Sequence, residues 1–366
     1  MRIRRLRLEP YRNFPRLKLD LDHEACLIIA DNGQGKSNVL ESISYLSIGK
    51  SIRGARDQEV VPHGTGHFDI QSVWDDGCRD RQVRMFYSTA EGKRAFLDGV
   101  DLPRLSDLVS LLCTVHFAPE DVSLVLQFAS QRRRLLDILL SQACPEYLQG
   151  LQRYNRALTQ RNHYLRRLAG RRPDPAERRV WGEQLAVPGG AIRRRRLETL
   201  VQMTPVFMRC YQTFSTGQEQ AGISYRSEPV PLSVEEIPPA ELLEQGLLAE
   251  LEADPFREEQ AGHTLCGPHR DSLSFTLAGS PADTYGSQGQ LKSLLLSWKM
   301  AEARFLEERS GSQPVLLLDD VFSELDETRS RRLVSLTEDF EQVILTAARP
   351  PGEEVGDRFQ RIEIAE

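Results

Sequence analysis

The chain has 366 residues, of which 40% are hydrophobic, and a formal net charge of −6, so it can bury a large core and divide into two lobes. The negative charge, taken alone, argues against a nucleic-acid binder, and no apolar run reaches the length of a membrane span. Residues 1–5 lead into a strand pattern without an apolar signal core, which predicts a cytoplasmic protein with no membrane partner.

The first predicted elements are strands over residues 3–8, 17–19 and 25–30, followed by a helix over 37–47. The segment Ala30-Asp-Asn-Gly-Gln-Gly-Lys-Ser lies between the third strand and this helix. Such a strand-loop-helix context is typical of a phosphate-binding loop (P-loop, Walker A), in which backbone N–H groups and the positive end of the helix face the phosphates. The segment therefore predicts half of an ATP site.

Two side chains of this loop are predicted to act on the ATP directly. Lys36 can reach the β- and γ-phosphates as a compact charge and is a candidate catalytic residue, while the Ser37 hydroxyl can coordinate Mg²⁺. The usual motif begins with glycine where this chain has Ala30, so the turn must avoid a positive φ or tolerate strain there. The other predicted nucleotide-binding residues are Asn32, Gly33, Gln34, Gly35 and Asn38.

Strands predicted over residues 69–74, 81–87 and 94–97 indicate an antiparallel sheet edge beside the nucleotide. A further buried strand is predicted over 111–117, after which Pro119 starts a helix. We expect the first lobe to end and the second lobe to begin at this point. An α/β ATPase lobe is predicted from residues 1–117 and 264–366, and a mostly helical, arginine-rich second lobe from residues 118–263, without a long coiled coil.

The charge of the second lobe is unevenly distributed. Residues 130–210 contain 17 Arg, no Lys and 6 acids, a balance of +11, whereas residues 228–259 contain 10 acids and one Arg, a balance of −9. Helical spacing over 131–140 and 147–168, with breaks at Pro173, Pro175 and Gly189-Gly190, predicts helices with arginine faces.

This basic stretch has two interpretations, a solvated helix surface or a surface that binds the DNA backbone. Residues 193–196 are four consecutive arginines that span a full helical turn, so some of them must be structural or solvated. Few aromatic residues accompany them, which favours duplex backbone contact over base stacking. The candidates for stacking are Tyr147, Tyr154 and Tyr164, and the candidates for DNA contact are Arg132, Arg133, Arg134, Arg193, Arg194 and Arg195.

Towards the end of the chain, predicted strands and helices alternate over residues 273–277, 288–308, 315–318, 326–337, 342–345 and 358–364. The strand over 315–318 is wholly apolar and is followed by Asp319 and Asp320, which places two acids at the edge of a parallel sheet where ligands bind. Asp319 is predicted to hold Mg²⁺ through water, and Asp320 to orient or deprotonate the attacking water as a catalytic residue.

The segment Tyr285-Gly-Ser-Gln-Gly-Gln-Leu-Lys, at the start of the long helix, resembles the L-S-G-G-Q signature motif of ABC-type ATPases. The resemblance implies that Ser287, Gly289 and Gln290 bind the γ-phosphate of ATP held by the opposite subunit. Gly286 and Gln288 depart from the motif, and ordinary helix capping would also explain a lone S-Q-G-Q.

Eight further or overlapping motifs extend along almost the whole chain: Leu8-Glu-Pro-Tyr-Arg-Asn-Phe, Asn32-Gly-Gln-Gly-Lys-Ser-Asn, Gly49-Lys-Ser-Ile-Arg, Phe117-Ala-Pro-Glu-Asp, Arg132-Arg-Arg, Gly267-Pro-His-Arg-Asp, Ser287-Gln-Gly-Gln and Leu318-Asp-Asp-Val-Phe-Ser-Glu-Leu-Asp. Together these motifs resemble those of the RecF family of bacterial recombination and repair ATPases, ABC-type relatives of the SMC proteins. The resemblance implies an ATP-dependent homodimer that binds double-stranded DNA and ss/ds gap junctions and cooperates with RecR and RecO in loading RecA.

Some positions depart from the family pattern or stay ambiguous. Ser272 replaces a usual second aspartate, and no glutamine occupies the Q-loop, which leaves Glu120 or Asp121 as the metal sensor. Thr346 takes the switch position that is histidine in transporters. His269 is open to two interpretations, a catalytic base or a structural hydrogen-bonder.

Asp320 also stands where ABC transporters carry the longer glutamate, and a misplacement of about 1 Å can cost roughly 10²-fold in rate. We therefore expect slow hydrolysis, with ATP acting as a timer on a DNA-bound dimer. Two alternatives remain: an ABC transporter ATPase subunit, which needs a membrane partner, and a monomeric P-loop metabolite kinase, which would leave Ser287 unused.

Overall fold

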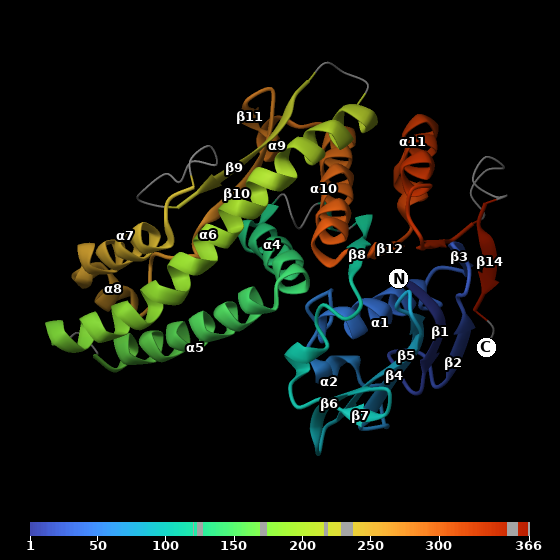
Figure 1. The fold of residues 1–366 in the computed structure, drawn as a ribbon, viewed down its shortest axis with the longest axis horizontal. Helices are drawn as coiled ribbons and strands as arrows, with labels where there is room; N and C mark the ends of the chain where they lie inside the picture. Colours follow the sequence, from blue (N-terminus) through green and yellow to red (C-terminus); the bar gives the residue numbers. More distant parts are fainter. Residues whose placement is uncertain are drawn as a thin grey trace. The chain divides into compact units, whose positions relative to one another are not determined.

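The computed structural model describes residues 1–119, 121–122, 127–168, 174–215, 219–227, 237–349 and 358–364 (Figure 1). The chain divides into two compact units. Unit 1 comprises Met1–Ser123, Arg209–Gln218 and Ser287–Glu366, and unit 2 comprises Leu124–Met208 and Glu219–Gly286. Among the described helices, none combines the length and the apolar character that crossing a lipid bilayer requires.

Unit 1 contains an antiparallel sheet in the order β2-β1-β4-β5-β6-β7 and a parallel sheet in the order β14-β3-β13-β12-β8. The strands are β1 (Arg2–Leu8), β2 (Leu17–Asp20), β3 (Ala25–Ile29), β4 (His67–Asp75), β5 (Asp80–Ser88), β6 (Gly92–Leu97), β7 (Val100–Asp101), β8 (Thr114–Phe117), β12 (Val315–Leu318), β13 (Val343–Ala347) and β14 (Gln360–Glu363). The helices are α1 (Lys36–Ile48), α2 (Asp57–Val60), η1 (Leu105–Asp107), α10 (Gln288–Ser310), η2 (Val321–Glu324) and α11 (Glu327–Thr337).

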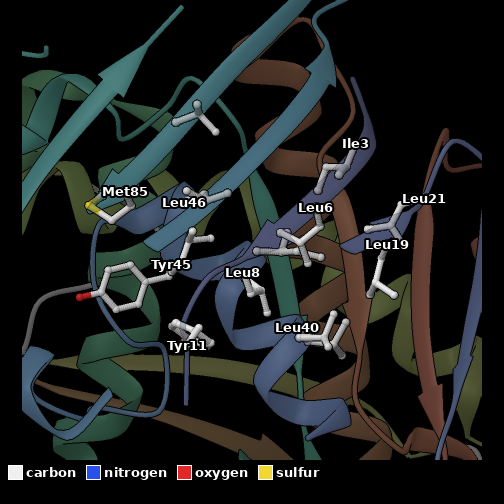
Figure 2. Packing of buried hydrophobic residues seen from close by; sticks show 14 of the residues in the cluster. Ile3, Leu6, Leu8, Tyr11, Leu19, Leu21, Leu40, Tyr45, Leu46 and Met85 are labelled. Carbon is white, nitrogen blue, oxygen red and sulfur yellow. The ribbon is translucent and has the colours of Figure 1, made fainter. Parts of the chain in front are cut away.

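A single hydrophobic cluster joins β1, α1 and the parallel sheet. Figure 2 shows side chains of β1, among them Leu6 and Leu8, packing near Leu40 and Leu46 of α1. The same cluster includes Leu317 of β12, so α1 contacts apolar residues that come from both sheets. Because burial of apolar surface is the main stabilising term in folding, this cluster fixes the helix that begins at the predicted phosphate-binding loop.

The central strands of the parallel sheet are buried on both faces, as their continuous apolar sequences predict. Every residue of β8, β12 and β13 is buried. Strand β13 lies between β3 and β12, so the loop after β3 and the acids after β12 occupy the same carboxyl edge of the sheet. The predicted strand over 315–318 is confirmed with both ends unchanged, and those over 25–30, 111–117 and 342–345 are confirmed with shifted ends.

Unit 2 combines helices with a small sheet in the order β11-β10-β9. Its elements are α4 (Ala129–Ala143), α5 (Pro145–Leu168), most of α6 (Pro175–Phe214), β9 (Ala221–Arg226), α7 (Ala240–Ala253), α8 (Pro255–Ala261), β10 (Ser272–Leu277), β11 (Ser280–Pro281) and α9 (Ala282–Tyr285). Because β10 pairs with β9, residues 264–286 group with unit 2, whereas the sequence pattern predicts them in the first lobe. Residues 209–218 likewise group with unit 1.

The predicted helix break at Gly189-Gly190 is wrong, because α6 continues through both glycines. Their backbones lie close against α7. A Cβ at Gly189 would lie 2.3 Å from a Leu247 methyl carbon, and one at Gly190 would lie 2.8 Å from the Glu244 backbone nitrogen. The glycines therefore allow two helices to approach closely, and this contact outweighs their low helix propensity. Pro175 begins α6, whereas Pro173 lies outside the described residues.

Candidate functional site

The loop between β3 and α1 has the backbone geometry of a phosphate-binding loop. Gly33 and Gly35 have φ angles of 87° and 93°, in the left-handed region that favours glycine. Ala30 does not have a positive φ, so the missing first glycine of the motif introduces no backbone strain. Gly35 is the N-cap of α1 and provides no side-chain cap, which leaves the first N–H groups of the helix for a ligand.

Lys36 is buried and its side chain turns back into this loop. Its Nζ donates to the carbonyl oxygens of Ala30 (2.6 Å) and Asp31 (2.9 Å) and lies 3.5 Å from Asn32 Oδ1. An ammonium group surrounded by oxygen acceptors is held in place before a ligand binds. The structure thus orders Lys36 and Asn32 in the loop, while their contact with phosphate stays a prediction.

The turn between β1 and β2 supports the phosphate-binding loop. A Cβ at Gly35 would lie 2.6 Å from both the Asn13 amide and the Phe14 ring. Asn13 also donates to the Gln34 carbonyl oxygen (3.3 Å) and accepts from Asn38 Nδ2 (2.7 Å). Asn13 therefore orders two predicted nucleotide-binding residues. Its place in the motif of residues 8–14 was the only signal of this role in the sequence.

Glu41 is a fully buried carboxylate on α1 that the sequence analysis missed. It accepts two hydrogen bonds from the Arg12 guanidinium, at 2.9 and 2.7 Å, and one from the Ser51 hydroxyl. Arg12 and Ser51 belong to two different motifs of the chain, so Glu41 ties both to the helix that follows the phosphate-binding loop. An acid at a core-facing position of the helical pattern is the signal that could have found it.

Asp319 and Asp320 follow β12 and are both linked to Thr346 of β13. The Thr346 hydroxyl donates to Asp319 Oδ1 (2.6 Å) and accepts from the Asp320 backbone nitrogen (3.0 Å). Asp319 is buried, whereas Asp320 is half-buried, has a φ of 42° and accepts from the Ser323 hydroxyl. Thr346 at the predicted switch position thus orients the acid that is predicted to hold Mg²⁺.

Replacing Thr346 by valine is expected to raise the Mg²⁺ concentration needed for half-maximal ATP hydrolysis by about 10- to 100-fold. The change removes a hydrogen bond from the predicted metal-binding carboxylate and leaves the Asp320 N–H without its acceptor. A titration of hydrolysis rate against Mg²⁺ measures the effect. Thr346→Ser should preserve the wild-type curve, and so should Thr337→Val, because the Thr337 hydroxyl donates to the backbone of its own helix. An unchanged curve for Thr346→Val would contradict the assignment.

Asp121, a candidate metal sensor, lies just after β8. Its carboxylate accepts from the Ala118 backbone nitrogen (3.1 Å) and lies 3.9 Å from His116 Nδ1. The second candidate, Glu120, lies outside the described residues. A sensing role for Asp121 stays a prediction.

The predicted signature residues form the N-terminus of α10. Ser287 is exposed and caps the helix: its hydroxyl accepts from the Gln290 backbone nitrogen (3.3 Å), while Gln290 Oε1 accepts from the Ser287 nitrogen (2.6 Å). This is a reciprocal capping box. Gly289 leaves room for the Arg329 guanidinium, which donates to Asp326 and would lie 3.0 Å from a Cβ at the glycine position. The N-terminus of α10 is therefore capped, and the positive end of the helix dipole faces solvent.

Two of the six arginines predicted to contact DNA are buried inside unit 2. Arg132 donates to the Leu273 carbonyl oxygen, and its exposed fraction is 7%. Arg193, with an exposed fraction of 1%, forms hydrogen-bonded ion pairs with Glu250 and Asp271. Both guanidinium groups therefore bind acceptors within unit 2 and are buried away from solvent. The prediction that they contact DNA is corrected to a structural role.

The other four arginines are more accessible. Arg194 and Arg195 have side-chain exposed fractions of 44% and 42% and pair with Glu198. Arg133 and Arg134 are half-buried, and Arg133 donates to a backbone carbonyl of unit 2. Burial of Arg193 beside exposed Arg194 confirms that the four consecutive arginines face different sides of the helix. DNA contact by the accessible four stays a prediction.

The motif Gly267-Pro-His-Arg-Asp lies in a buried polar cluster of unit 2. Asp271 accepts from Arg193 and from the Tyr225 hydroxyl (2.6 Å). His269 Nδ1 lies 2.7 Å from the Tyr154 hydroxyl and its Nε2 lies 3.3 Å from the Thr264 carbonyl oxygen. Burial lowers the pKa of His269 to about 4, so the ring is neutral at pH 7 and both nitrogens are engaged. The geometry favours the structural interpretation of His269.

Comparison with known proteins agrees with this arrangement. The family model described as RecF/RecN/SMC N terminal domain matches residues 2–366. The DNA replication and repair protein RecF of Heliobacterium modesticaldum is 38% identical over 335 residues, which cover 92% of this chain and 89% of that protein. A solved structure of the recombination mediator protein RecF with ATP in the RecFOR pathway has a TM-score of 0.90 at 28% identity, with 99% of this chain and 95% of that chain covered.

A more distant likeness supports the fold alone. The Smc head bound to the C-winged helix domain of ScpA has a TM-score of 0.57 at 13% identity, over 100% of this chain and 94% of that chain. The family match spans both units, with the phosphate-binding loop, the acids after β12 and the N-terminus of α10 in place. This chain therefore belongs to the RecF family, whose fold is that of the SMC heads.

Proposed function

We propose that this chain is an ATP-dependent DNA-binding protein of recombinational repair, whose ATP-bound dimer holds double-stranded DNA or an ss/ds junction until slow hydrolysis releases it. Family membership and the likeness to a RecF structure with ATP support the proposal. The observation that carries it is the exposed N-terminus of α10. Among the described residues, the Ser287 hydroxyl caps its own helix and forms no hydrogen bond with the phosphate-binding loop of the same chain. Such an end suits a γ-phosphate from a second subunit.

The residues around the carboxyl edge of the parallel sheet fit Mg²⁺ and ATP. Backbone N–H groups after Gly33 and Gly35 and the Lys36 ammonium supply positive charge for the phosphates, while Ser37 and Asp319 supply the oxygen ligands that Mg²⁺ prefers. The metal, when bound, would neutralise developing charge on the transferred phosphoryl group. Asp320, held at a left-handed φ beside Asp319, would orient the attacking water.

In this proposal the accessible arginines Arg133, Arg134, Arg194 and Arg195 supply DNA backbone contacts. The family resemblance supports RecR and RecO as partners and a role in loading RecA. A cytoplasmic location, expected from the N-terminal sequence pattern, is part of the same proposal. Slow turnover follows from the short side chain of Asp320, whose carboxylate also accepts a hydrogen bond from the Ser323 hydroxyl (3.1 Å).

Sedimentation of the protein with and without ATP and a short duplex tests the proposal. We expect a dimer only with ATP, and we expect DNA to sediment with that dimer. The logarithm of the DNA-binding constant should fall with the logarithm of the salt concentration at a slope near −5 if about six phosphates are contacted. A Ser287→Arg variant should stay monomeric. Ser287→Asp should as well, because aspartate keeps the helix cap but repels the γ-phosphate.

Ser335→Arg is a matched control, since Ser335 is an exposed serine on α11, and it should dimerise normally. An unchanged monomer that binds ATP and phosphorylates a small acceptor would favour the monomeric kinase. Association with a membrane partner in place of DNA would favour the transporter subunit.

A further inference from the structure

A hollow of about 640 Å³ lies between the C-terminal half of α5 and the start of α6, two helices that run side by side in Figure 1. Unit 2 alone forms it. Its walls combine aromatic, basic and polar side chains, and none of them belongs to the ATP site or to the buried cluster around Asp271. The lining residues are Thr159, Gln160, His163, Tyr164, Arg167, Leu168, Glu177 and Trp181.

Two aromatic side chains form the apolar wall of the hollow. The Tyr164 and Trp181 rings have centroids 6.1 Å apart and are tilted by 31°. The rings already contact each other, so a flat ligand would stack on the free face of one ring and not between them. Both residues are only half-buried, whereas the stacking candidates Tyr147 and Tyr154 are buried in the core. Tyr164 is thus the candidate of the three that remains accessible.

The polar side chains of the hollow carry both signs of charge. Arg167 and His163 are exposed, and Arg167 forms no ion pair within the described part of the chain. Glu177 is also exposed and faces the same hollow. The Tyr164 hydroxyl is enclosed beside Glu177. Burial and this neighbouring carboxylate raise the pKa of Tyr164, so its hydroxyl is a neutral donor at pH 7.

We propose that this hollow binds one unpaired nucleobase of a DNA strand, stacked on Trp181 or Tyr164, with the adjoining phosphate held by Arg167. Stacking on an aromatic ring suits any base, and a cation beside the ring suits the backbone. The Glu177 carboxylate accepts hydrogen bonds, so it favours bases with an amino group, as in adenine and cytosine, over thymine. The inference rests on the proposed function and adds to it a direct way to read the single-stranded side of a junction.

Intrinsic fluorescence offers a selective test of the hollow. The chain has three tryptophans, and Trp74 and Trp298 are buried, with exposed fractions of 2% and 0%. Oligo-dA added to the whole protein should quench the accessible Trp181, more strongly than oligo-dT at equal concentration. This arm needs neither ATP nor a duplex, so it tests the hollow even if the proposed function fails. Absence of quenching would overturn the inference.

The second arm compares a blunt duplex with the same duplex carrying a short oligo-dA tail, both with ATP. The tail should raise the affinity by at least about fivefold, in line with stacking of one base. Trp181→Ala and Arg167→Gln should abolish the gain, Trp181→Phe should keep it, and Arg156→Gln, an exposed arginine on the same helix, is the matched control. A gain that survives Trp181→Ala would overturn the inference, whereas weak, ATP-independent binding of the blunt duplex would count against the proposed function alone.

Discussion

Replacing Asp320 by asparagine is expected to lower the rate of ATP hydrolysis by about 10²- to 10⁴-fold, the usual contribution of a positioned general base, while ATP binding persists. Asparagine has the shape of aspartate and tolerates the φ of 42° at this position. It can also keep the hydrogen bond with the Ser323 hydroxyl. The substitution therefore removes the negative charge and leaves the backbone turn after β12 as it is.

Single-turnover hydrolysis of ATP, measured beside equilibrium ATP binding, separates the two effects. Asp254→Asn is a suitable control, because the Asp254 carboxylate caps α8 in unit 2 by accepting from the Arg257 nitrogen (3.0 Å), and asparagine caps a helix about equally well. Its hydrolysis rate should stay close to wild type. A wild-type rate in Asp320→Asn would show that another group activates the water.

The strands of unit 1 could be predicted from sequence because each carries its own local signal. Val315 to Leu318 form a short apolar run bounded by turn residues, and such a run reads as a buried strand without knowledge of its neighbours. The break expected at Gly189-Gly190 failed for the opposite reason. What decides its conformation is the approach of Leu247, more than fifty residues later in the chain, and no local pattern reports such a contact.

The residues of the candidate ATP site also divide into those that a local sequence pattern identifies and those that depend on contacts between distant segments. Lys36, Asp319 and Asp320 belong to contiguous motifs whose spacing carries their chemistry, so they could be identified directly. The core-facing position of Glu41 on its helix is a local signal of a buried acid, but its partners Arg12 and Ser51 come from other segments, so no motif identifies its role. Arg132 and Arg193 were wrongly predicted as DNA contacts on similar grounds, because net charge along a stretch cannot show that Arg193 pairs with two acids of distant elements.

Replacing Arg193 by methionine is expected to destabilise unit 2 by about 3–5 kcal/mol, the typical cost of removing one member of a buried ion pair. The Arg193 side chain has an exposed fraction of 2%, and those of Glu250 and Asp271 are 4% and 1%. Methionine fills much of the same space, but it leaves two carboxylates buried close together without a cation. Their mutual repulsion and lost hydration are the physical cause of the expected loss.

Hydrogen exchange of the peptides that span α6, α7 and β10 measures this loss within unit 2. The midpoint of a global unfolding curve would combine the stabilities of both units and is less informative. Arg194→Met is the matched control, because Arg194 is exposed and pairs with Glu198 at the surface, and its effect should not exceed about 1 kcal/mol. Adding Glu250→Gln and Asp271→Asn to Arg193→Met should recover part of the stability, since neutral side chains tolerate burial better than unpaired charges. Equal, small effects of Arg193→Met and Arg194→Met would show that the buried pairs contribute no more than surface ones, and would reopen Arg193 as a DNA contact.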